Sequence, residues 1–187
     1  MARITDNNIV KPALWIASFT FVIGLFISLG MESLIEVIQD VWLSLLALIL
    51  VIFLGIAADA IGTAAAAAKI IPFNAMAAKK VPGAIEAANL TRNADLVANL
   101  TADVVGDISG TLSGAMGASI VFTLATRFSL ADTVLLGAAM TSLIAAVTVG
   151  GKTVGKRIAI NHANSIILRL GQFLRWLDDH TGIKVLR

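Results

Sequence analysis

Residues 103–117 read DVVGDISGTLSGAMG, and this stretch combines acidic residues with a regular series of small ones. Asp103 and Asp107 are four residues apart, so on a helix they share one face. The small residues of the series recur at every fourth position, at Gly106, Gly110 and Gly114. Such a glycine ladder lets the backbone of another helix approach closely. The stretch therefore predicts a helix that is both a packing surface and a polar site.

The composition of the whole chain indicates an integral membrane protein. Of its 187 residues, 58% are hydrophobic and only 14% are charged, and the mean hydropathy is +0.90. Soluble domains carry about 25% charged residues, so these values exclude that class. The chain has no cysteine, which excludes disulfides and thiolate metal sites. Its net charge of +2 gives no reason to expect nucleic acid as a partner.

Several apolar runs approach the ~20 residues that a helix needs to cross a bilayer. We therefore expect one all-α transmembrane domain over 1–187. We expect four membrane-spanning helices, a helical hairpin between the second and third, and a juxtamembrane amphipathic helix after the fourth. The expected spans are 12–30, 41–68, 96–127 and 133–149, with the hairpin at 73–92 and the amphipathic helix at 156–176. Pro82 is expected to divide the hairpin into two short helices.

The distribution of charge predicts an orientation in the cell membrane. Lysine and arginine gather near the N-terminus, in residues 69–92 and after residue 151, whereas residues 31–40 are acidic. The positive-inside tendency then places both termini and the hairpin in the cytoplasm of a multi-pass protein. The first apolar run lacks the small-residue cleavage site of a signal peptide, so we expect it to be a retained helix.

Three aspartates, Asp59, Asp103 and Asp107, lie inside segments that are otherwise apolar. A carboxylate at bilayer depth costs roughly 2.5–3.5 kcal/mol on insertion scales, so it usually faces the bundle interior and has a partner. One interpretation is a metal site, with hydroxyl oxygens from Thr63 and Ser109, because Mg²⁺ prefers such oxygen ligands. The other is a structural cluster in which each aspartate hydrogen-bonds across helices. No nucleophile, base and orienting group occur together, so we do not expect an enzyme.

The glycine ladder has its own two interpretations. Gly106, Gly110 and Gly114 can pack against another helix of the same chain or against a second copy. Because closed two-fold dimers are the commonest oligomers, we expect a homodimer in the lipid bilayer.

Residues 41–178 resemble the transmembrane domain of the CorC/cyclin-M magnesium transporters in the order of their elements and in four short motifs. A Gly-Ala-x-x-Ala-x-x-Leu motif is intact at residues 83–90. Thr63-Ala64 matches the end of a Ser-x-Ser-Glu-Thr-Ala motif and places Asp59 at its first serine. Residues 102–107 match Gly-Asn-Asn-x-x-Asn with aspartate for two asparagines, and residues 152–159 match Glu-x-x-Pro-Lys-x-x-Ala.

This resemblance implies an intramembrane site that binds Mg²⁺, with an extra N-terminal span at 12–30 and without the CBS domains that usually follow. Two positions depart from the family. The glutamate expected to help bind the cation is Lys152, and the proline that unwinds the chain is Gly155. Lys152 is then either an internal counter-ion inside the site or an ordinary cytoplasmic anchor like Lys156 and Arg157.

The sequence thus predicts transport or sensing of a divalent cation, with Mg²⁺ as the first candidate. Two alternatives stay open: a membrane scaffold that kept the fold without transporting, and a transporter coupled to Na⁺ or H⁺ through the aspartates.

The predicted orientation can be tested by labelling. Single cysteines introduced at Ser33 and Lys80 should react with a membrane-impermeant thiol reagent from opposite faces of the membrane, because the positive-inside tendency separates these segments. Labelling of both from the same face would rule out the four-span arrangement.

Overall fold

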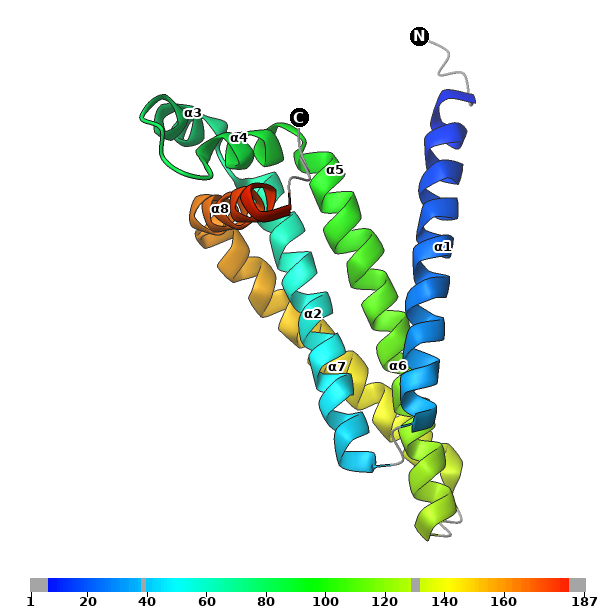
Figure 1. The fold of residues 1–187 in the computed structure, drawn as a ribbon. Coiled ribbons are helices and arrows are strands. Elements are labelled where there is room, and N and C mark those ends of the chain that lie inside the picture. Colours follow the sequence, from blue (N-terminus) through cyan, green and yellow to red (C-terminus); the bar gives the residue numbers. More distant parts are fainter. Residues whose placement is uncertain (1–6, 38–39, 129–131, 182–187) are drawn as a thin grey trace.

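The computed structural model describes residues 7–37, 40–128 and 132–181, and within these ranges every regular element is a helix. The helices are α1 (Asn7–Val37), α2 (Val41–Ala67), α3 (Ile70–Ala78), α4 (Ala84–Arg92), α5 (Ala94–Ala98), the π-helix η1 (Asn99–Val105), α6 (Gly106–Phe128), α7 (Thr133–Asn161) and α8 (Ala163–Thr181). The three elements α5, η1 and α6 follow one another without a break and form one long rod (Figure 1). The all-α class expected from the sequence is therefore confirmed for the described residues.

Three of these helices are long and apolar enough to cross a membrane: α2, the rod from Ala94 to Phe128, and α7. The first expected span, 12–30, lies within α1, but its apolar part, Leu14–Gly30, is shorter than a full span. Helix α1 also continues through most of the acidic segment to Val37. Three spans are thus supported by length and composition, and the span at 12–30 stays a prediction.

Helices α2, α6 and α7 pack against one another and form the body of the bundle. One apolar cluster fills the space between them, made of Leu48, Ile52, Leu112, Met116, Ile120 and Ile144. Helix α1 stands outside this group beside α6 (Figure 1). Its described contact is near Gly24, where a side chain of Ile108 lies 3.8 Å from the position that a Cβ would take. The core is therefore built by three helices, and α1 contributes little to it.

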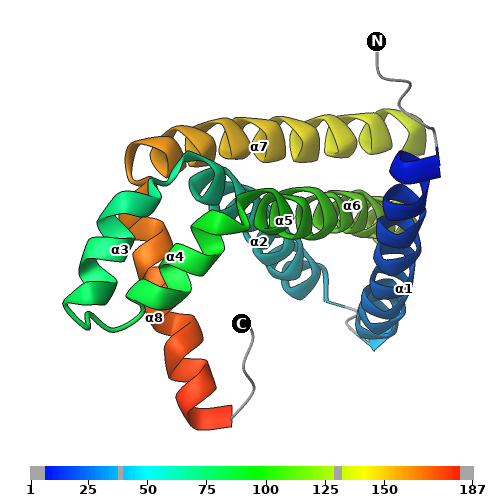
Figure 2. The same cartoon turned by 90° about the horizontal axis from the view of Figure 1, so that it is seen from above.

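The helices α3, α4 and α8 gather at one end of the bundle, as the view from above shows (Figure 2). A second apolar cluster joins them to α2 and α7, with Ala64, Ala65, Phe73, Ala87, Ala88, Leu90, Val97, Ala159, Ala163 and Ile167 as its buried members. The expected pair of short helices on either side of Pro82 is present as α3 and α4. The chain turns into α4 at Gly83, whose φ of 79° suits glycine.

The motif at residues 83–90 has a packing role at this end. Gly83, Ala84, Ala87 and Leu90 are all buried. A Cβ on Gly171 of α8 would collide with the carbonyl oxygen of Gly83 and would lie 2.8 Å from the nitrogen of Ala87. The small residues of the motif therefore allow α4 and α8 to pack backbone against backbone.

The glycines that bring the long helices together are not the ones that the ladder predicted. On α2, a Cβ at Gly55 would lie 2.8 Å from Cβ of Ser109, and a Cβ at Gly62 would lie 3.1 Å from Cα of Ala98. Within the ladder, Gly106 is buried in a contact, but a Cβ at Gly110 or Gly114 would meet nothing within 4 Å. Within the chain, α6 turns Gly110 and Gly114 away from α2 and α7, and packing of these two glycines against a second copy stays a prediction.

A larger side chain at Gly62 should destabilise the bundle. Gly62→Leu has no room against Ala98, Thr101 and Ala102, and overpacking of this kind costs about 1–3 kcal/mol. The melting temperature of the detergent-purified protein should fall. Gly150→Leu on α7 is the matched control, since a Cβ there meets nothing within 4 Å, and equal melting of the two variants would contradict the close contact.

The open side of the ladder makes a separate prediction about assembly. If a second copy covers Gly110, Gly110→Leu should reduce the dimer population seen by size-exclusion chromatography with light scattering while leaving the melting of the monomer unchanged. Gly137→Leu, at another open glycine on α7, should leave the mass unaltered. A full dimer population in the Gly110 variant would mean that the ladder lies outside any interface between copies.

Candidate cation site between three helices

The three packed helices all become polar at the same level, between the two apolar clusters. On α2 the change falls between Ile52 and Ala64, on the rod between Val97 and Leu112, and on α7 between Ile144 and Ala159. Beside apolar residues such as Ile56 and Val104, this level holds glycines, hydroxyl residues, one aspartate and two lysines: Gly55, Asp59, Gly62, Thr101, Gly106, Ser109, Thr148, Gly151, Lys152, Gly155 and Lys156. A polar layer that interrupts an apolar bundle is the first place to look for a binding site.

Asp59 is the most deeply buried charged side chain of this layer, with only 6% of its side chain exposed. It lies on α2 between Gly55 and Gly62, and both glycines pack against the rod, so its side of α2 faces the rod as well. Its Oδ1 atom is 3.5 Å from Nζ of Lys156. Its Oδ2 atom is buried and accepts no hydrogen bond. A buried carboxylate oxygen without a donor is costly, and a cation or an ordered water would relieve that cost.

Two lysines of α7 enter the layer from the opposite side. Lys156 forms the ion pair with Asp59, whereas the sequence had offered Lys152 as the internal counter-ion and Lys156 as a plain anchor. Lys152 points instead at the rod, where its Nζ lies 3.6 Å from the position of a Cβ on Gly106. The carbonyl oxygens of Thr101 and Gly55 lie 3.6 Å and 3.9 Å from that same point. Lys152 is thus also inside the layer, close to backbone oxygens.

A spacing in the sequence is the signal for one part of this arrangement. Thr148, Lys152 and Lys156 follow one another at every fourth position, which places them on one face of α7. That face also carries Gly151 and Gly155, which contact Ile56 of α2. The spacing thus predicts that both lysines share a face, and the contacts of the two glycines show that this face meets α2.

The rod changes its winding opposite Asp59. Residues Asn99–Val105 form a π-helix, in which the N–H of Gly106 donates to the carbonyl oxygen of Thr101, five residues earlier. Such π-helical turns are frequently found at functional sites. This one carries the residues that contact Gly62, namely Thr101 and Ala102. The wider turn therefore forms the wall of the layer that faces α2.

The hydroxyl groups predicted as ligands lie in or beside the layer, but their protons are engaged within their own helices. Thr63 donates to the carbonyl oxygen of Asp59 at 2.9 Å, and Ser109 donates to that of Val105 at 2.7 Å. A hydroxyl that donates in this way still has lone pairs that can accept a hydrogen bond or bind a cation. The hydroxyl of Thr148, missed by the sequence analysis, is buried without a hydrogen-bond partner.

The other two aspartates do not join Asp59. Asp103 and Asp107 are exposed in the single chain, on the face of the rod that also carries Thr111 and Gly114. Among the described residues, no three histidine, aspartate or glutamate side chains gather closely enough to hold a metal ion. Val104, Gly106 and Ser109 are buried on η1 and α6, whereas both carboxylates are exposed, so the described part of the chain does not gather the three aspartates in one site.

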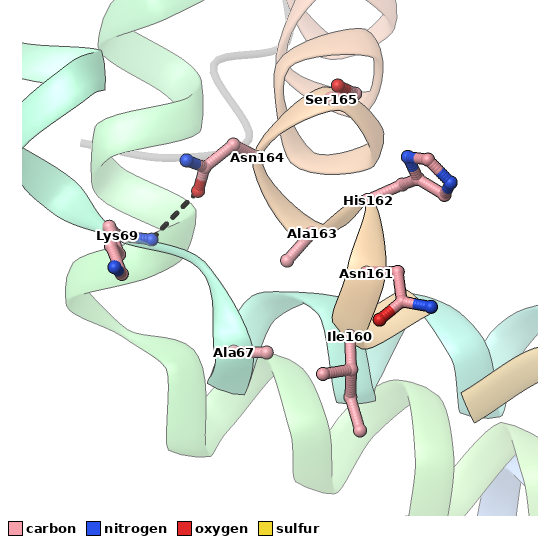
Figure 3. A pocket seen from close by; sticks show the side chains of 8 residues that line it. All are labelled: Ala67, Lys69, Ile160, Asn161, His162, Ala163, Asn164 and Ser165. Carbon is pink, nitrogen blue, oxygen red and sulfur yellow. Dashed lines mark hydrogen bonds between the residues drawn. The ribbon is translucent and has the colours of Figure 1, made fainter. Parts of the chain in front are cut away.

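A pocket also opens where α2 leads into α3 and α7 leads into α8 (Figure 3). Figure 3 shows the side chain of Asn164 directed at the backbone of Lys69, whose N–H donates to Oδ1 of Asn164 at 2.9 Å. His162 points away from this hydrogen bond. Asp59 does not line the pocket, so the pocket is separate from the polar layer.

Comparison with known proteins finds no match to this chain among family models, curated proteins or solved structures.

Proposed function

We propose that this protein transports or senses a cation within the membrane and that Asp59 is the central ligand. The observation that carries the proposal is the buried Oδ2 atom of Asp59, which has no donor although it lies among three packed helices. An unsatisfied carboxylate oxygen in such a place has a strong preference for a positive charge. Binding of a cation would therefore account for an aspartate at this buried position.

Mg²⁺ is the first candidate for the ion. It is a hard cation that binds through one or two carboxylates, keeps several waters, and takes carbonyl and hydroxyl oxygens as further ligands. Asp59 supplies the carboxylate, and the hydroxyls of Thr63 and Ser109 and the carbonyl of Gly55 are the candidate neutral ligands. The resemblance to the CorC/cyclin-M domain supports the same ion, since Asp59 and Thr63 fall within one of its motifs.

The proposal also includes the exposed aspartates, which we assign to an interface between two copies of the chain. Asp103 and Asp107 lie beside the open glycines of α6, and ionised carboxylates are unfavourable against lipid. We place a second copy against this face, in a homodimer that crosses the cell membrane with both termini in the cytoplasm and with 12–30 as a fourth span.

The ion pair between Asp59 and Lys156 favours a second candidate, a membrane scaffold. A lysine beside a buried carboxylate can neutralise it permanently, and then no ion is needed. Coupling to Na⁺ or H⁺ is the third candidate, because one carboxylate suffices for a monovalent ion. These functions differ in what they predict for added cations.

Cation-dependent melting separates them. For the detergent-purified protein, a divalent cation at a hundredfold excess over Kd should stabilise the fold by about 2.7 kcal/mol. Asp59→Asn should abolish this stabilisation, because the hard ion loses its charged ligand. Asp95→Asn is the control: it removes an exposed carboxylate near the start of the rod and should keep the full stabilisation by the cation.

Each other pattern of melting points to a different function. Stabilisation by Na⁺ alone, lost in Asp59→Asn, would favour the monovalent transporter. A wild-type curve that ignores Mg²⁺, Mn²⁺, Ca²⁺ and Na⁺ alike would leave the scaffold as the function. Loss of the Mg²⁺ effect in Asp103→Asn as well would show that the second carboxylate acts at the same site, from a partner copy.

A further inference from the structure

The ion pair of Asp59 joins two groups whose surroundings differ greatly. The side chain of Lys156 is 52% exposed, whereas that of Asp59 is 6% exposed. The separation of 3.5 Å between Nζ and Oδ1 exceeds the about 2.7–2.9 Å of a strong charge-assisted hydrogen bond. Lys156 is therefore held at the carboxylate by its charge rather than by close hydrogen bonding.

This difference decides which partner can leave. A lysine reaches outward on a flexible four-carbon stem, so its ammonium can return to water at little cost. Asp59 is fixed on α2 between two glycines that pack against the rod, and it cannot reach water without separating the helices. Any exchange of partners at Asp59 must occur by departure of Lys156.

We propose that Lys156 is a tethered competitor for the cation site: it neutralises Asp59 when no cation is bound and swings outward when one binds. This inference rests on the proposed function, and it adds the means by which the site is held closed. The ammonium of Lys156 and the incoming cation share Oδ1 of Asp59, while Oδ2 stays available to the cation alone. Two positive charges at one carboxylate repel, so binding and departure occur together.

The neighbouring Lys152 does not replace Lys156 in this role. Its Nζ is directed at Gly106 on the rod rather than at Asp59, and it forms no ion pair with the described residues. From there it stays as a fixed positive charge near the site after Lys156 has left. The departure of Lys156 is thus the step that removes charge from the layer.

Competition of this kind predicts that removal of the lysine strengthens binding. If Lys156 occupies the carboxylate nine-tenths of the time, its loss should lower the apparent Kd about tenfold, since the apparent constant scales with the inverse of the open fraction. Lys156→Gln should show this gain for Mg²⁺, measured by melting curves over a range of MgCl₂ concentrations with the full chain in detergent. Arg157→Gln is the matched control, because it removes one exposed positive charge from the next residue and should keep the wild-type Kd.

Lys156→Gln leaves the buried carboxylate without a partner, so this variant is purified with Mg²⁺ present throughout. Lys156→Arg keeps the charge and provides the second measurement. Because guanidinium binds carboxylate through two parallel hydrogen bonds, this variant should bind Mg²⁺ no more tightly than the wild type. A gain in Lys156→Arg as large as that in Lys156→Gln would show that charge is not the cause.

The outcomes distinguish this inference from the proposed function. If the wild type binds Mg²⁺ and loses it in Asp59→Asn, but Lys156→Gln binds with unchanged or weaker affinity, the competitor is excluded and the cation site stands. If only Lys156→Gln binds, the lysine closes the site in the wild type. If neither binds Mg²⁺, Mn²⁺, Ca²⁺ or Na⁺, the cation site and its competitor are both excluded.

Discussion

A buried carboxylate in a bundle of membrane-length helices is the constraint on which the arrangement depends. Asp59 cannot be moved to the surface, because α2 packs on both the rod and α7 at that level. The charge must therefore be neutralised inside the bundle, and the described contact that neutralises it is the ion pair with the ammonium of Lys156. Since that contact reaches one carboxylate oxygen and leaves the other without a donor, the neutralisation is incomplete. An incomplete pair is suited to exchange, whereas a fully satisfied one would favour a fixed structure.

Glycines on the surrounding helices let the backbones approach closely at this layer. Gly55 and Gly62 bring α2 against the rod, and Gly151 and Gly155 bring α7 against α2. Close backbones bring carbonyl oxygens into the layer, as around Gly106, where the carbonyls of Thr101 and Gly55 and the ammonium of Lys152 all lie within 4 Å of the position of a Cβ. The apolar clusters on either side add buried side chains to these backbone contacts. The layer is therefore a packing surface as well as a polar level of the same three helices.

The helices α3, α4 and α8 at the end of the bundle hold the C-terminal ends of α2 and α7 in place. Helix α8 follows α7 after a single residue, His162, and its Gly171 packs against α4. The N–H of Lys69, just after α2, is held by Asn164 of α8. These contacts tie the ends of the two helices that carry Asp59 and Lys156, so they support the distance between the paired groups.

The sequence alone determined the helical class, three membrane-length helices and the break at Pro82, and it singled out Asp59 as a candidate, because apolar length, proline and a charge in an apolar segment act locally along the chain. It left Lys152 open between an internal counter-ion and an anchor and took Lys156 as an anchor, since a motif aligned along the chain does not say how far each side chain reaches. Only the tertiary structure decided that Asp103 and Asp107 face away from Asp59, that Gly55 and Gly62 rather than Gly110 and Gly114 make the close contacts, and that Lys156 is the partner. The physical reason is rotation: a helix repeats every 3.6 residues, and the π-helical turn at Asn99–Val105 changes which face of the rod meets α2, so spacing shows which residues share a face but not where that face points.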